Sequence, residues 1–243
     1  MDQQQSITPA FWFGEYRDGY TDHVYARYGQ EPGWVDGESR ELDRPHPVRR
    51  YRWGYYGART WCAAMQSGAP SRRSTIACKI LLRPVAWRGE KVLVGDWKRL
   101  IKHADARREM RLFVADVADR LLNNIVGEGH SRYHDRMQHA VTEARRYARG
   151  ECDYNELVEA QKCLKSANVA DGRTEIFEVW SAALNATGDS EVDAVREVLT
   201  YSNWIDLPWI YPLFDSWMEA AFVRAAFARA SGEEVTQTCD GSQ

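Results

Sequence analysis

The spacing of apolar residues changes near residue 105 from every second position to about every 3.6 positions, and this change constrains the fold more than any other feature. The segment STIACKILLRPVAW has the first spacing and predicts a strand that Pro84 ends. The apolar face of this strand is Ile76, Cys78, Ile80 and Leu82. The segment from residue 110 to residue 122 has the second spacing and predicts a helix. The apolar face of this helix is Met110, Phe113, Val114, Val117, Leu121 and Leu122.

Further helices are marked by residues that begin or end helical turns. A second helix carries an apolar stripe over residues 137–148, and Gly150 ends it. Asp153 is expected to cap a third helix, with Glu156 three residues later completing a capping box. Ser190 is expected to cap a fifth helix.

The remaining two helices are predicted from their apolar pattern. A fourth helix begins at about residue 174. The segment WIDLPWIYP breaks the helical pattern at Pro208 and Pro212, and a last helix follows it. The inward face of the last helix is Phe214, Trp217, Met218, Ala221, Phe222 and Ala225.

Together these elements predict an α+β protein in two parts. Residues 1–103 are expected to form a small, basic, β-rich N-terminal part. Within it, residues 11–60 are read as short strands and loops, and residues 92–94 as a short strand that a further extended segment follows. Residues 104–232 are expected to form an all-α helical bundle, and residues 233–243 a polar tail.

Charge is distributed unevenly along the chain. Residues 1–110 hold 19 Lys and Arg against 13 Asp and Glu, a net charge of +6, whereas residues 111–243 hold 13 against 22, a net charge of −9. Residues 49–108 alone hold 15 basic and three acidic residues. Such asymmetry indicates layers or domains with different partners. The pI of about 6.1 argues against a non-specific nucleic-acid-binding protein, because most such domains are strongly basic.

Cysteine usage and hydropathy predict where the protein resides. The five cysteines are irregularly spaced and none belongs to a CxxC pair, which predicts free thiols in a reducing compartment. They are Cys62, Cys78, Cys152, Cys163 and Cys239. Residues 1–13 do not have the pattern of a secretory signal, and no stretch approaches the roughly 18 apolar residues that span a bilayer. We therefore expect a cytoplasmic protein without a membrane partner.

The segment HSRYHDRMQHAVTEARRYARGEC gathers potential metal ligands. At about 100° per residue, His134 lies roughly 40° around the helix from His130, whereas His139 lies roughly 180° from it. At most two histidines therefore share a face, while a closed zinc site needs about four ligands. The apolar stripe of residues 137–148 explains the pattern better, and we expect no metal site.

Motifs for catalysis and for cofactors are not found in the sequence. It has no GxSxG, no cysteine–histidine pattern of a known protease type, and no GxxxxGK[ST] or GxGxxG loop. Asp116 and Asp119 lie off the apolar face of their helix and are expected to be solvated. We therefore expect no catalytic residues and no cofactor.

Two segments are candidates for binding. The basic aromatic segment RRYRWGYYGARTW (residues 49–61) combines arginines that can contact phosphates or carboxylates with rings that can stack on bases. Its candidate residues are Arg49, Arg50, Arg52, Tyr55, Arg59 and Trp61. The alternative is a solvated surface that pairs with the acidic helical half.

The second candidate is the tryptophan-rich segment WIDLPWIYPLFDSWMEAAF (residues 204–222). Tryptophan is enriched at the energetic centres of protein interfaces, so this segment is a candidate partner surface. Its candidate residues are Trp204, Trp209 and Tyr211. The alternative is that it belongs to a terminal helix docked on the bundle.

The order of YYGARTWCAAMQSGAP, IACKILLRPVAWRGEKVLV and HADARREMRLFVADVADRLL resembles a run in uncharacterised bacteriophage and prophage proteins. In those proteins two strands are joined by a turn similar to residues 89–91 of this chain. A helix follows, and it begins like residues 104–106 of this chain. RMQHAVTEARRYARGECDYNELVEA resembles a helical segment of the same proteins and of putative immunity proteins. The resemblance covers residues 52–165. Residues 57–59 are Gly-Ala-Arg here, where those proteins often carry a histidine.

The resemblance implies an accessory protein of a mobile element and brings no established reaction with it. The expected function is non-enzymatic binding of a host or partner protein, as in immunity or counter-defence, in the host cytoplasm if a phage encodes the chain. One alternative is a protein or enzyme that binds a nucleotide or nucleic acid through the basic aromatic segment, and it predicts that Arg49, Arg50, Arg52, Tyr55 and Arg59 converge on one concave pocket. The other is a structural component of the virion.

Overall fold

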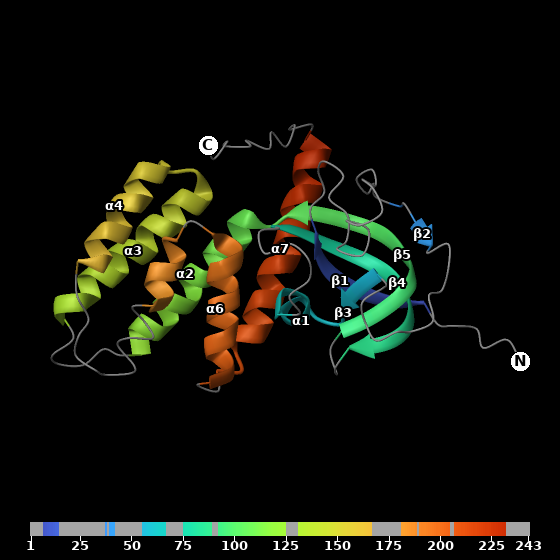
Figure 1. The fold of residues 1–243 in the computed structure, drawn as a ribbon. Coiled ribbons are helices and arrows are strands. Elements are labelled where there is room, and N and C mark those ends of the chain that lie inside the picture. The colour runs from blue at the N-terminus through green and yellow to red at the C-terminus, as the bar shows by residue number, and fades with distance from the viewer. Residues whose placement is uncertain are drawn as a thin grey trace, which may run out of the picture.

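The computed structural model, shown in Figure 1, describes the strands and most of the helices of the chain. The described residues are 7–14, 37, 39–41, 55–66, 75–88, 92–124, 131–166, 181–188, 190–204 and 207–231. Strands gather at one end of the molecule and α3 and α4 lie at the other, with α1, α6 and α7 between them (Figure 1).

The strands form one antiparallel sheet that closes on itself. Its members are β1 (Thr8–Gly14), β2 (Ser39–Glu41), β3 (Tyr55–Ala58), β4 (Ile76–Arg88) and β5 (Val92–Asp105). Strand β4 pairs with both β1 and β5, and β3 pairs with β5 and with β1. These four pairings complete a circuit, to which β2 adds at the outer edge of β5. A closed sheet leaves fewer strand edges unpaired.

Strand β4 has the predicted alternation but is longer than predicted. The face of Cys78, Ile80 and Leu82 points into the closed sheet. The prediction that Pro84 ends the strand is wrong, because β4 continues to Arg88. The register shifts on both sides of Pro84, and a proline is tolerated at such an irregularity because its missing N–H removes no regular ladder bond.

Strand β5 joins the short strand predicted at residues 92–94 and the extended segment predicted after it into one strand. It runs for 14 residues and pairs with β4 along its whole length. The polar run Asp96 to Arg99 concealed the continuity of this strand, since Lys98 does not look like an interior residue. Lys98 is nevertheless fully buried, and its Nζ lies 3.3 Å from the centre of the Trp12 ring. An ammonium group over an indole face is a cation–π contact.

The described helices follow the sheet in the chain, apart from one short helix. They are α1 (Trp61–Gln66), α2 (Arg107–Asn124), α3 (Ser131–Arg149), α4 (Tyr154–Lys165), α6 (Glu191–Trp204) and α7 (Ile210–Ser231). Residues 181–186 are also helical. The mixed α and β composition is as predicted. Among the described residues, no helix is both long and apolar enough to cross a membrane.

Several predicted helix ends are confirmed. Gly150 follows α3 with a φ of 75°, the left-handed conformation that favours glycine. Asp153 and Glu156 form both hydrogen bonds of the capping box at the start of α4. Ser190 accepts the N–H of Asp193 at the start of α6. The break predicted at Pro212 is wrong, because α7 begins at Ile210 and the first helical turn does not use the N–H that proline lacks.

The sheet and the helices share one hydrophobic core. Phe13 of β1 packs against Trp61 of α1 and Phe214 of α7, and Phe214 also packs against Phe113 of α2. Strand β5 ends at Asp105 and α2 begins two residues later. The division of the chain at residues 103 and 104 stays a prediction.

The buried guanidinium group of Arg111 fixes α2 against the end of the helical residues 181–186. Arg111 is 4% exposed and donates to the carbonyl oxygens of Ala186 (2.8 Å) and Gly188 (3.0 Å). It also forms an ion pair of 2.6 Å with Glu191 at the start of α6. One guanidinium group thus joins the end of one helix to the start of the next.

We expect Arg111→Leu to lower the free energy of unfolding by about 3 kcal/mol or more, because it leaves Glu191 and two carbonyl groups without a donor. Urea denaturation measures this change. Arg149→Leu, at the exposed end of α3, is the matched control and should change the value by less than about 0.5 kcal/mol. Equal effects of the two changes would contradict the anchoring role of Arg111.

We also expect Gly95→Ala to destabilise the closed sheet by about 1–3 kcal/mol. A Cβ atom at Gly95 would lie 2.6 Å from the carbonyl oxygen of Arg83 and 2.6 Å from Cγ of Leu82, so the backbone of β4 would have to move. Thermal unfolding followed by circular dichroism checks the expectation, and a melting temperature equal to that of the wild type would refute it.

Candidate functional site

The structure describes part of the basic aromatic segment. Arg49, Arg50 and Arg52 lie outside the described residues, and Tyr55 begins β3 with a side chain that is not described. Arg59 follows β3 and is exposed. Trp61 is 1% exposed and lies in the core, where its ring contacts Phe11, Phe13 and Phe222. The predicted convergence of the arginines on one pocket therefore stays a prediction.

The candidate residues of the tryptophan-rich segment lie at the junction of α6 and α7. Trp204 ends α6, and its side chain is outside the described part. Trp209 is half-buried, and the guanidinium of Arg120 lies 5.1 Å from its ring centre. Tyr211 is half-buried in the first turn of α7.

From each candidate segment, one of the predicted binding residues lines the same open cavity. This cavity has a volume of about 360 Å³ and lies between α1 and α7; we call it the α1–α7 cavity. Its lining residues are Arg59, Thr60, Cys62, Ala63, Gln66, Tyr211 and Asp215. Arg59 comes from the basic aromatic segment, whereas Tyr211 and Asp215 come from the tryptophan-rich segment. Two segments about 150 residues apart in sequence thus form one recess.

Helix α1 is held in place by hydrogen bonds at both ends. Oγ1 of Thr60 accepts the N–H of Ala63 at 3.1 Å, as an N-cap residue does. At the other end, Nε2 of Gln66 donates to the carbonyl oxygen of Leu199, and Nε of Arg196 donates to that of Met65. The wall that α1 contributes to the cavity is therefore anchored to α6.

Asp215 is the acidic residue that lines the cavity. Its carboxylate accepts the backbone N–H groups of Trp61 and Cys62. Burial raises the pKa of Asp215 above its ordinary value, and the nearby carboxylate of Glu219 raises it further, while the two backbone donors lower it. The net result is a carboxyl group that ionises less readily than one in water.

The Cys62 thiol serves as a hydrogen-bond donor in this cavity. Its Sγ lies 3.8 Å from the carbonyl oxygen of Tyr211 and 4.0 Å from Oδ1 of Asp215. Both partners are acceptors, so the thiol donates between the backbone of Tyr211 and the side chain of Asp215.

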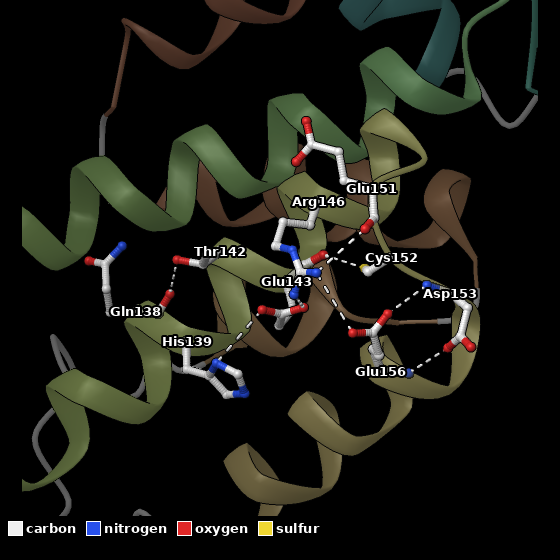
Figure 2. Close-up of polar contacts among 9 residues, drawn as sticks. All are labelled: Gln138, His139, Thr142, Glu143, Arg146, Glu151, Cys152, Asp153 and Glu156. Atoms are coloured by element: carbon white, nitrogen blue, oxygen red, sulfur yellow. Dashed lines mark hydrogen bonds and ion pairs between the residues drawn. The ribbon is translucent and has the colours of Figure 1, made fainter.

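A second polar cluster lies where α3 meets α4 (Figure 2). Arg146 pairs with the buried Glu143 at 2.7 Å and with Glu156 at 3.7 Å, and both acids raise the pKa of Arg146, Glu143 more strongly. Sγ of Cys152 donates to the carbonyl oxygen of Glu143, and burial and the two carboxylates raise the pKa of Cys152. In Figure 2 the dashed contacts of Arg146 run to Glu143 on α3 and to Glu156 on α4, so the cluster fixes the α3–α4 junction.

Most of the potential metal ligands of residues 130–152 lie in the described part of the chain. His130 lies outside the described residues, while His134 is half-buried beside the exposed Asp135, and His139 faces Glu143 at 4.0 Å. Within the described residues, no three His, Cys, Asp or Glu side chains are placed so that they could hold a metal ion.

The expectation that Asp116 and Asp119 are solvated is wrong. Arg145 of α3 donates to both carboxylates, at 2.7 Å and 3.0 Å, and Nε1 of Trp217 donates to Asp116 at 3.2 Å. These contacts link α2 to α3 and to α7. Positions off the apolar face of one helix can still face a neighbouring helix, which helical periodicity alone does not reveal.

Sequence reasoning did not single out Asp215 or Cys62. Asp215 follows Tyr211 by four positions and so lies on the same face of α7, but this spacing does not reveal its contacts with α1. No comparable signal existed for Cys62, since its neighbours in the cavity come from a helix about 150 residues later.

Comparison with protein-family models, with curated proteins and with solved structures found no match to this chain.

We expect the stability of the wild type relative to Asp215→Asn to fall as the pH rises. An acid with a raised pKa in the folded state stabilises that state while protonated, below its ordinary value of 3.8, and loses this contribution as the pH rises through the higher folded-state pKa. Asparagine stays neutral and can still accept the N–H groups of Trp61 and Cys62.

Urea denaturation at a series of pH values measures this difference. Asp135→Asn, whose side chain is 96% exposed on α3, corrects for the change of one unit in net charge. A difference between wild type and Asp215→Asn that grows in favour of the wild type with rising pH would refute the interpretation.

Proposed function

We propose that this chain is an accessory protein of phage or prophage origin that binds a host or partner protein in the cytoplasm, without catalysing a reaction. The α1–α7 cavity carries the binding part of this proposal, because it joins Arg59 and Tyr211, one residue from each candidate segment. The mobile-element origin is supported by the resemblance over residues 52–165 alone.

The α1–α7 cavity has the properties of a recess for a partner side chain. Its volume of about 360 Å³ lies in the usual range of small binding sites. Arginine and tyrosine are enriched among the residues that dominate binding energy at protein interfaces, where partner side chains fill pockets. The exposed Arg59 and the half-buried Tyr211 can both reach an approaching partner.

Helix α7, which forms one wall of this cavity, is also fixed to α2. Nε of Arg224 donates to Glu109 of α2 at 2.7 Å, so α7 is fixed on the side away from α1. We propose that residues 104–232 act as a bundle whose role is to hold α7 against α1. A rigid wall lowers the entropy that binding costs.

A nucleotide-binding protein is the second candidate, because Arg59 lines the cavity. Arginine can hold a phosphate through two parallel hydrogen bonds. Asp215 in the same cavity opposes this function, since its carboxylate repels a phosphate group. A virion structural component remains the third possibility from the sequence, and no contact in the described residues favours it over the other two.

We expect Arg59→Ala and Tyr211→Ala to weaken capture of the partner by about tenfold or more each. Affinity purification from cells that produce the tagged protein, followed by quantitative mass spectrometry, measures the amount of each captured protein. Lys162→Ala, on the exposed surface of α4, is the matched control and should leave capture unchanged.

Two results would contradict the proposal. One is a set of captured proteins that is the same for wild type, cavity variants and control. The other is turnover of a nucleotide by the purified wild type, with loss of turnover in Arg59→Ala, which would favour the second candidate instead.

A further inference from the structure

The two carboxylates of α7 near α1 differ in how their charge is compensated. Glu219 accepts Nε1 of Trp61 at 3.2 Å and Nζ of Lys79 at 2.5 Å, so a cation balances it. The contacts of Asp215, one turn earlier, are the N–H groups of Trp61 and Cys62 and the Cys62 thiol, which are all neutral donors. Among the described residues, no lysine or arginine forms an ion pair with Asp215.

The charge of Asp215 restricts what can fill the α1–α7 cavity. An apolar side chain would displace water from the carboxylate without replacing its hydrogen bonds, which is unfavourable. An anionic side chain would be repelled by it. A long aliphatic stem that ends in a cation avoids both costs, because the stem lies against the walls while the cation meets the carboxylate.

The walls of the cavity suit such a stem. Ala63 and Cys62 contribute small apolar surfaces from α1, and Tyr211 contributes from α7. The half-buried position of Asp215 strengthens its attraction for a cation, since the effective dielectric constant is lower than in water. Arg59 repels a cation in the cavity, but it is exposed, so solvent screens this repulsion more than it screens the attraction of the half-buried Asp215.

We propose that the α1–α7 cavity receives a lysine or arginine side chain of the partner protein, with its cationic end bound by Asp215. This inference rests on the proposed function, because it specifies the chemistry of the residue through which the partner is held. The raised pKa of Asp215 agrees with it, since a bound cation would supply the compensation that the carboxylate lacks.

Small probes of matched size test the proposal on the whole chain. The probes are n-butylguanidinium, its neutral counterpart pentanamide and the anion pentanoate. Binding is followed by nuclear magnetic resonance, through the backbone amides of Trp61 and Cys62, which donate to Asp215 in the cavity. We expect n-butylguanidinium to shift these resonances and to bind at least about tenfold more tightly than either other probe.

Asp215→Asn should weaken binding of n-butylguanidinium by about tenfold or more while circular dichroism shows an unchanged fold. Asp135→Asn, which removes an exposed carboxylate from α3, is the matched control and should leave binding unchanged. If Asp215→Asn fails to fold, the comparison of the three probes on the wild type still decides the question.

Three outcomes would overturn the proposal. Tighter binding of pentanoate would assign the cavity to an anion at Arg59. Equal binding of pentanamide and n-butylguanidinium would assign it to an apolar residue, and no binding of any probe would remove the cavity as an anchor. In each case the proposed function is judged separately, because loss of partner capture in Arg59→Ala and Tyr211→Ala does not depend on the charge of the anchor.

Discussion

Helix α2 is buried along most of its length, so each of its charged residues that faces inward must find a partner on another element. Its Glu109 and Arg111 are among the few charged residues with less than 5% exposure, and a buried charge without a partner would be strongly destabilising. Arg111 donates to the carbonyl oxygen of Ala186 and to Glu191 at the start of α6. Glu109 accepts from Arg224 of α7. These requirements fix the positions of the neighbouring helices around α2.

Helix α7 links α2 to the sheet through side-chain contacts on both. On one side Arg224 binds Glu109 and the carbonyl oxygen of Asp105, and on another Glu219 binds Lys79 of β4 and Trp61 of α1. The α1–α7 cavity lies on the same helix, between groups held from both directions. The walls that α1 and α7 contribute are therefore set by the core of the molecule, while Arg59 and Thr60 line the cavity from the exposed segment before α1.

What could be predicted from the sequence was what depends on short-range pattern. The capping residues Asp153 and Ser190 act within a few positions, and these predictions are confirmed, whereas the predicted start of the fourth helix near residue 174 lies outside the described residues. Pro84 was misjudged because only pairing with β5 creates the register shift that accommodates it. Lys98 hid the middle of β5, since its burial depends on Trp12 in another strand.

The candidate site shows the same limit. Arg59 and Tyr211 stood out in the sequence as separate features, and only the fold brings them to one cavity. Asp215 takes its properties from the backbone of Trp61 and Cys62, which no local pattern links to it. Residues whose role depends on contacts about 150 positions apart cannot be recognised from spacing alone.

The contacts of Glu219 also have a consequence for how the chain acquires its structure during translation. Strand β4 and helix α1 leave the ribosome well before α7, which follows every other labelled element. Until then Lys79 has no Glu219 to bind, and the side of Trp61 that packs on Phe222 stays exposed to solvent. The nascent chain must carry this uncovered aromatic surface through most of its synthesis, and chaperones bind such surfaces.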